Sequence, residues 1–221
     1  MDGAPVTLAL SISSGNAVQI LLLAGGLTLI PAVLFTVTGF SRILIVLGFI
    51  RTAVGTTTAP PNQVLIGIAL FLTIFVMSPT ISAINKEALQ PLEHKAISTS
   101  VALEHAEVPL RQFMFRQTQV QDISLFVSLA KIKRPKTQAE LPTQVLIPAF
   151  IVSEMKSAFQ IGVLIFLPFL IIDLIVSSTL MSMGMIMLPP TFISLPLKIL
   201  LFVLVDGWDL VIKALVQSFH T

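Results

Sequence analysis

The chain has 221 residues, of which 55% are hydrophobic and 11% are charged, with a mean hydropathy of +0.96. Soluble domains carry about 25% charged residues, so the composition indicates a single integral membrane domain, residues 1–221. The net charge of +2 predicts no nucleic-acid partner, and the absence of Cys excludes disulfides and thiolate chemistry.

The first part of the chain, about residues 17–85, is expected to form apolar helices. Met1–Pro5 lack the basic start of a secretory signal peptide, so none is expected. Gly, Thr and Pro gather in Thr52–Pro61 and predict a turn. The uncharged segment Asn62–Asn85 that follows predicts a membrane span, because about 20 apolar residues cross a bilayer.

Residues 86–141 form a polar section. Apolar residues recur at helical spacing from Leu110 to Phe126 and predict an amphipathic helix, with Pro109 in its first turn. The basic segment Lys131–Lys136 follows. It is interpreted as a solvated turn, or alternatively as a contact to lipid headgroups.

Residues 142–221 are apolar again, and we expect five prolines to break them into pieces. Backbone groups freed by proline in hydrocarbon need protein partners, so kinked hairpins packed against other subunits are predicted. The prolines are Pro148, Pro168, Pro189, Pro190 and Pro196.

Four methionines alternate within the last apolar region, just before Pro189-Pro190. Met is unbranched and adaptable, and Gly184 within the stripe adds backbone freedom. Spacing alone leaves two alternatives open, namely packing in the core or against lipid, and a deformable seal. The methionines are Met181, Met183, Met185 and Met187.

Several charged residues lie in or beside the apolar runs. An unpaired charge in a membrane costs about 2.5–3.5 kcal/mol or more, so each needs a partner or a water-filled path. Either a gate for ions or structural ion pairs within or between subunits would satisfy them. The residues are Arg42, Glu154, Lys156, Asp173, Lys198 and Asp206.

Enzyme signals are weak. His94, His105 and His220 lie outside the apolar runs and lack metal-ligand spacing. Asp173 and Asp206 are two carboxylates in apolar runs, but their contexts differ from the Gly-rich setting of aspartyl proteases. No catalytic residue, metal or cofactor is therefore predicted.

Short motifs are distributed over much of the chain: Phe40–Gly48, Ala59–Gly67, Ala69–Thr73, Val76–Pro79, Pro109–Thr118, Ser153–Gly162, Leu167–Leu174 and Leu195–Trp208. Together they resemble the FliP family of flagellar type III export-gate membrane proteins, over about residues 20–219. Phe-Gln-Ile-Gly, Met-Ser-Pro and the Pro-Pro after the methionines favour the flagellar branch over the related injectisome proteins.

The resemblance implies an all-α protein of kinked helical hairpins. Five copies would assemble with FliQ and FliR into a helical cone, alongside FlhA and FlhB. The cone would sit in the bacterial inner membrane within the flagellar basal body, partly on the periplasmic side, in contact with lipid. Unfolded flagellar subunits would pass through it. A cleaved signal peptide is usual in the family, and none is expected from the residues at the start of this sequence; either the sequence is the mature form or its first apolar run is itself the insertion signal.

The resemblance also implies roles for single residues. The family's pore gasket maps onto Met185, Ile186 and Met187, with Met183 close by, and Ile186 replaces a usual Met. Glu154 and Lys198 match the family's subunit-linking ion pairs. Arg42 and Asp173 are expected to pair with each other or with a partner, and Gln119 stands where a basic residue is common.

Two other functions remain open at this stage. A virulence-type secretion gate shares the same mechanism. An ion-coupled transporter would use Asp173 and Lys198 as relay groups.

Overall fold

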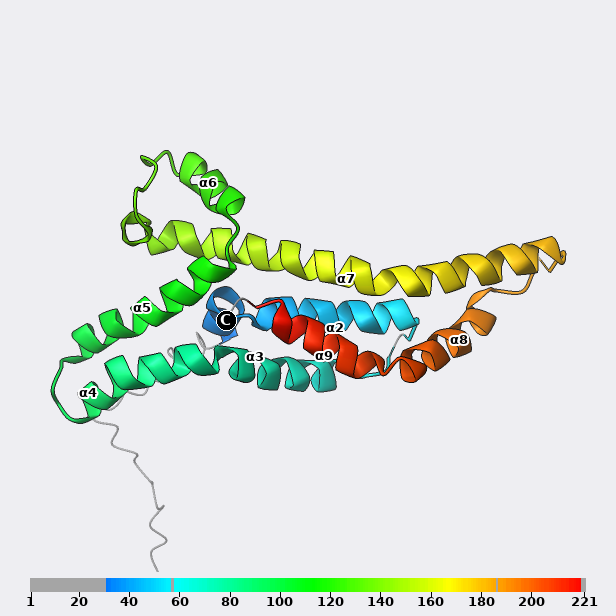
Figure 1. Cartoon of the computed structure of the whole chain (residues 1–221), viewed down its shortest axis with the longest axis horizontal. Coiled ribbons are helices and arrows are strands. Elements are labelled where there is room, and N and C mark those ends of the chain that lie inside the picture. The colour runs from blue at the N-terminus through cyan, green and yellow to red at the C-terminus, as the bar shows by residue number, and fades with distance from the viewer. Residues whose placement is uncertain (1–30, 57, 186, 220–221) are drawn as a thin grey trace, which may run out of the picture. The chain divides into compact units, whose positions relative to one another are not determined.

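The computed structural model describes residues 31–56, 58–185 and 187–219 (Figure 1). The chain divides into two compact units, residues 1–34 and 35–221. Only residues 31–34 of the first unit are described, and they are helical. The apolar helix expected before residue 31 lies outside the described residues. The second unit carries all the labelled helices.

All regular structure in the described part of the chain is helical, as the all-α expectation requires. Two helical stretches, Asn62–Glu93 and Thr143–Ser182, are long and apolar enough to cross a membrane, and a bent pair upstream raises the number to three if it counts as one span. The elements are α2 (Phe40–Val54), α3 (Asn62–Ile84), the π-helix η1 (Asn85–Leu89), α4 (Gln90–Glu93), α5 (Thr99–Gln117), α6 (Val120–Leu129), the 3₁₀ helix η2 (Gln138–Glu140), α7 (Thr143–Ser182), α8 (Thr191–Leu204) and α9 (Gly207–Gln217).

The span predicted at Asn62–Asn85 is confirmed as a helix by α3, which ends one residue earlier. It contains no charged residue, so no side chain competes with the helical pattern. The helix then continues through η1 into α4, and Pro79 is accommodated inside it.

The amphipathic helix predicted from Pro109 to Phe126 is wrong in its bounds. Helix α5 begins ten residues before Pro109, at Thr99, and the Ser98 side chain caps it by accepting from the backbone of the third residue. The chain then breaks at Thr118 and Gln119, which are extended. The break has a tertiary cause, since the backbone N–H of Gln119 donates to Ser153 Oγ on α7 at 3.0 Å.

The expectation that five prolines break the last region is also wrong for three of them. Pro148 and Pro168 lie inside the uninterrupted 40-residue α7, and Pro196 lies inside α8. Each removes one backbone donor, while the flanking hydrogen bonds keep the helix. Of the five, only Pro189 and Pro190 stand at a helix boundary, just before α8.

The core of the second unit forms where α2 runs alongside α7 (Figure 1). On α2, residues at helical spacing turn one face inward and are almost fully buried. The two helices pack tightly at Gly162, where an added Cβ would lie 2.5 Å from the Phe49 ring. That ring also meets Phe159 edge to face at 5.3 Å. The large apolar residues buried on these two helices include Ile43, Val46, Leu47, Ile50, Leu146 and Phe150.

Candidate functional site

Arg42 lies at the centre of a buried polar cluster, the Arg42 cluster, which comprises Arg42, Gln117, Glu154 and Ser218. Its side chain is 2% exposed, and that of Glu154 is 0% exposed. The guanidinium makes two hydrogen bonds to the Glu154 carboxylate, and the one from Nε to Oε2 is 3.0 Å long. This bidentate ion pair joins α2 to α7 with both charges out of water.

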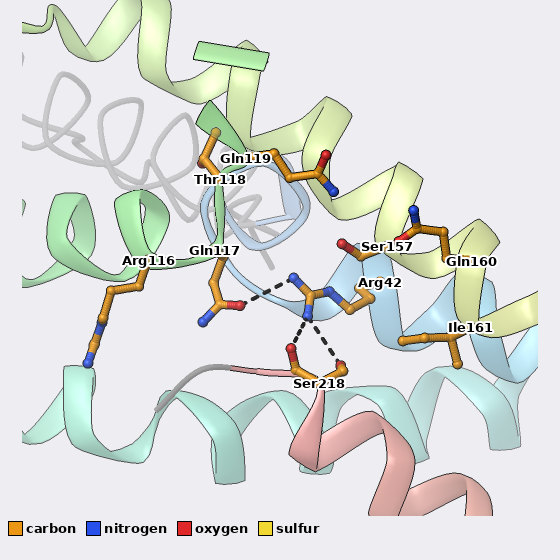
Figure 2. A pocket seen from close by; sticks show the side chains of 9 residues that line it. All are labelled: Arg42, Arg116, Gln117, Thr118, Gln119, Ser157, Gln160, Ile161 and Ser218. Carbon is orange, nitrogen blue, oxygen red and sulfur yellow. Dashed lines mark hydrogen bonds between the residues drawn. The ribbon is translucent and has the colours of Figure 1, made fainter. Parts of the chain in front are cut away.

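The other donors of Arg42 reach two further segments (Figure 2). Nη2 donates to Gln117 Oε1 at 3.3 Å, at the end of α5. Nη1 donates to the backbone carbonyl of Ser218 at 2.8 Å and to its Oγ at 3.2 Å. Ser218 caps the C-terminal end of α9, where the partial negative charge of the carbonyls favours a cation. One side chain thus holds α2, α5, α7 and α9 together.

A cavity of about 340 Å³ adjoins the Arg42 cluster. All of its lining residues except Ile161 have an amide, hydroxyl or guanidinium group, so the cavity offers hydrogen-bond partners to water. Figure 2 shows the lining residues: Arg42, Arg116, Gln117, Thr118, Gln119, Ser157, Gln160, Ile161 and Ser218.

A second buried network joins α6 to α7. Asp122 is 1% exposed, and its Oδ2 accepts from Ser153 Oγ at 2.6 Å. Its other carboxylate oxygen pairs with Lys156. The same Ser153 hydroxyl accepts the backbone N–H of Gln119. One turn of α7 therefore contacts α6 through Ser153 and α2 through Glu154.

Lys198 of α8 pairs with Asp173 of α7, with 2.5 Å between Nζ and Oδ2. The lysine side chain is 7% exposed and the aspartate side chain 37%. The ammonium also lies near Gly55, at the C-terminal end of α2, where helix carbonyls favour a positive charge. Lys198 is thus enclosed by its own chain, while Asp173 keeps an open side.

The connection between α7 and α8 contains the Met loop, residues 183–187. Helix α7 ends in a Schellman turn, in which the Met185 N–H donates to the Leu180 carbonyl at 3.0 Å and the Gly184 N–H to the Met181 carbonyl at 3.1 Å. Gly184 has a φ of +76°, the left-handed conformation this turn needs. The turn therefore ends α7 before the two prolines.

The methionine side chains of the Met loop point into open space. Met183 is 67% exposed, Met185 43% and Met187 97%. Core packing within the chain is thereby excluded for Met187. An apolar hollow of about 290 Å³ lies under the first two, bounded by α7 and by Ile193 of α8.

A tight turn at Val205 and Asp206 joins α8 to α9, which begins at Gly207. Asp206 is exposed and adopts a φ of +52°. Gly207 lies against the Phe202 ring and has no room for a Cβ. Trp208 meets the same ring edge to face at 5.4 Å. The Val-Asp-Gly-Trp motif is thus explained by a turn closed over Phe202.

Known proteins show the family to which the chain belongs. The sequence profile of the FliP family matches residues 23–215. The chain belongs to the FliP family. A protein of Bacillus subtilis (strain 168) is 54% identical over 204 residues, covering 92% of each chain. One of Pectobacterium carotovorum is 53% identical over 205 residues (93% and 80% of the chains), and one of Aquifex aeolicus is 46% identical over 216 (96% and 90%). All three are named flagellar biosynthetic protein FliP.

In this FliP-family chain the expected charges find partners in their own chain. Glu154 pairs with Arg42, and Lys198 pairs with Asp173. Arg42 and Asp173 therefore each contact one of the two residues expected to link subunits, and the linking role stays a prediction. Asp206 lies on the surface of the single chain.

The expected gasket residues are only partly described. Met183, Met185 and Met187 lie in the Met loop, and Ile186 lies outside the described residues. Among the residues that the structure does describe, no three His, Asp or Glu side chains gather into a metal site.

Sequence reasoning missed the partners Gln117, Asp122 and Ser153. The sequence does carry a signal for Ser153. Ser153 and Lys156 are three residues apart, so a helix places them on one face, while Glu154 lies on another face. No local pattern marks Gln117 or Asp122, which are selected by packing between helices.

Proposed function

We propose that this chain is a pore-forming subunit of the flagellar type III protein export gate. In this role it passes unfolded flagellar subunits across the bacterial inner membrane, within the basal body and partly on its periplasmic side. The observation that carries the proposal is the exposed Met loop on a Schellman turn at the end of α7, in a chain of the FliP family.

The side chains of the Met loop are suited to sealing a pore. Its described methionine side chains are flexible and apolar, so they close around an empty pore and rearrange around a passing polypeptide. The hollow beside Met183 and Met185 gives these side chains room to move aside. Gly184 adopts the left-handed conformation at which the loop leaves α7.

The length of α7 supports a gate that extends beyond the bilayer. Forty helical residues span about 60 Å, roughly twice the thickness of the hydrocarbon core. One helix of this length serves a cone that rises from the membrane better than it serves a simple span.

The surface of the chain supports assembly with other helices. Large apolar side chains on α7 are exposed in the single chain and need a cover of protein or lipid. We propose that five copies, together with FliQ and FliR, cover them, and that FlhA and FlhB adjoin this assembly. Asp173, open on one side, is the ion-pair member that a neighbouring copy reaches first. The exposed residues include Val163, Leu164, Leu167, Ile171, Leu174 and Ile175.

The seal is tested with the double substitution M185A/M187A in the assembled complex. Removing two thioether side chains from the ring of loops opens a gap, so we expect small ions to leak through reconstituted vesicles while assembly is unchanged. Ion flux is measured by a fluorescent dye enclosed in the vesicles.

The matched control is M155A, because Met155 is 44% exposed but lies in α7, away from the Met loop. It should leave the flux at the wild-type level. Equal flux in M185A/M187A and wild type would contradict the seal. Failure to co-purify with FliQ and FliR would contradict the gate itself.

A further inference from the structure

Helix α9 lies against the rest of the chain along one narrow line of residues, which the proposed export function does not use. The buried residues are spaced four apart, so they share one side of the helix. Most of the other residues of α9 are exposed. The helix is therefore a strap that is held along a single seam and at its two ends. The buried residues are Gly207, Val211, Leu215 and, just beyond the helix, Phe219.

We propose that Ser218 and Phe219 form a latch that holds this strap closed over Arg42, and that the strap opens when the latch is released. With the latch docked, the Arg42 side chain is only 2% exposed. When the latch leaves, the face of the guanidinium that it covers meets water, and the donors that bind Ser218 turn to water as well. The fold thus contains a closed state with a dry Arg42 and an open state with a hydrated one.

The Phe219 ring occupies a fitted site between α2 and α5, where it is 3% exposed. The guanidinium carbon of Arg42 lies 4.1 Å from the centroid of this ring, and the Phe113 ring of α5 stacks on it at 6.5 Å. Gly39, just before α2, lies so close to the ring that a Cβ there would have no room. A cation over the face of the ring attracts it, so the site favours an aromatic side chain over an aliphatic one.

Ser218 supplies the polar half of the latch. Its backbone carbonyl and its Oγ accept from Nη1 of Arg42 at 2.8 and 3.2 Å, as Figure 2 shows. The same hydroxyl donates to the Leu215 carbonyl at 2.7 Å, so it is bound on both sides. Both latch residues therefore contact one side chain, Arg42, and we expect them to dock and to leave together.

Cavities at both ends of α9 weaken its hold on the rest of the chain. At its start, an apolar hollow of about 270 Å³ lies between α7, α8 and α9, next to Leu210 and Val211. At its end, the polar cavity of about 340 Å³ reaches Ser218. Side chains beside a cavity have fewer packing partners, and a segment with few buried contacts opens locally at a lower free energy than the core. We therefore expect α9 to open while the packing of α2 on α7 stays intact.

The test is hydrogen–deuterium exchange of the full chain in detergent, measured peptide by peptide. In F219A we expect the amides of α9 to exchange roughly 100-fold faster, because truncating a buried Phe shifts an equilibrium by about that factor or more. The amides of α3 and α8 should exchange as in the wild type. Modification by phenylglyoxal, which reacts with accessible guanidinium groups, then reports on Arg42 itself. We expect it to modify Arg42 in F219A but not in the wild type, while the exposed Arg134 reacts in both.

The matched control is F71A, because Phe71 is 77% exposed on α3 and its loss leaves the latch untouched. Its α9 amides should exchange at the wild-type rate. F219L keeps an apolar side chain but offers no aromatic face to Arg42, so its exchange rate should lie between those of the wild type and F219A. This milder variant also decides the question if F219A does not fold.

Equal α9 exchange in the Phe219 variants and the wild type would overturn the proposal. Equal acceleration in α3, α8 and α9 would also overturn it, since Phe219 would then support the whole fold rather than close one strap. An Arg42 that stays unmodified while α9 exchanges fast would show that the strap does not cover it. None of these results bears on the export function, which depends on the Met loop.

Discussion

At the residue scale, the Arg42–Glu154 pair determines how α2 and α7 meet. Both side chains are almost fully buried, so each charge depends on the other for the solvation that water no longer provides. A buried pair adds little net stability over apolar residues of similar volume, but it is costly to break. Its contribution is therefore to the register of the two helices.

Removing one member of the pair should therefore cost more stability than replacing both. We expect R42A to lower the free energy of unfolding by about 3–5 kcal/mol, because Glu154 is left buried and uncompensated. Replacing both residues, as R42M/E154L, should cost less than R42A alone. Thermal unfolding in detergent measures both variants.

The control for this prediction is R51A. Arg51 donates to Asn62 Oδ1 at 2.5 Å in an exposed setting, so its loss should cost about 1 kcal/mol or less. If the double replacement cost as much as its two single changes added together, the pair would not be coupled and the interpretation would be contradicted.

How much of this site is predictable from sequence depends on distance along the chain. Arg42 in an apolar run demands a partner, and the sequence alone indicates that need. Its partners Glu154, Gln117 and Ser218 lie 112, 75 and 176 residues away, so no local pattern selects them. Lys198 and Asp173 are only 25 residues apart, yet they too are joined by the return of α8 along α7.

At the element scale, the difference between α3 and α5 explains what local pattern predicts. Helix α3 is predictable to within one residue because a long uncharged apolar run predicts a membrane-spanning helix. The break between α5 and α6 is not, because Ser153 of α7 takes the N–H that would have continued the helix. Secondary structure thus follows the sequence where the helix is autonomous and follows packing where a neighbour competes.

The packing of α2 on α7 gives a prediction at this scale. In G162A the new methyl group would meet the Phe49 ring at 2.5 Å, so the ring must leave its contact with Phe159. We expect a loss of about 1–3 kcal/mol, the usual cost of overpacking. Thermal unfolding of the full chain measures it.

Gly48 on α2 offers the matched control, because nothing lies within 4 Å of the position that an alanine methyl group would occupy there. G48A should be neutral or stabilise the chain by up to about 1 kcal/mol, since Ala favours helix over Gly. Equal stability of G162A and wild type would mean that the two helices pack less tightly than the structure has them.

At the scale of the whole molecule, the single chain leaves many large apolar side chains exposed. Its apolar composition predicts a membrane protein, but composition does not separate side chains that face lipid from those that face another copy. Along α7 the exposed apolar side chains form a stripe at helical spacing, which includes Leu164, Ile171 and Leu174. The proposed assembly requires that neighbouring copies cover this stripe.

The triple substitution L164A/I171A/L174A tests whether lipid or another copy of the chain covers this stripe. These side chains are 67%, 53% and 61% exposed, so truncating them should leave helix content and membrane insertion unchanged. If other copies pack on the stripe, the triple variant loses contacts between copies that detergent cannot replace. The fraction of the protein that is multimeric should then fall several-fold, as measured by light scattering. The control L103A/V108A truncates two exposed residues of α5 and should keep the wild-type mass. An unchanged mass for the triple variant would place lipid, rather than protein, against this face of α7.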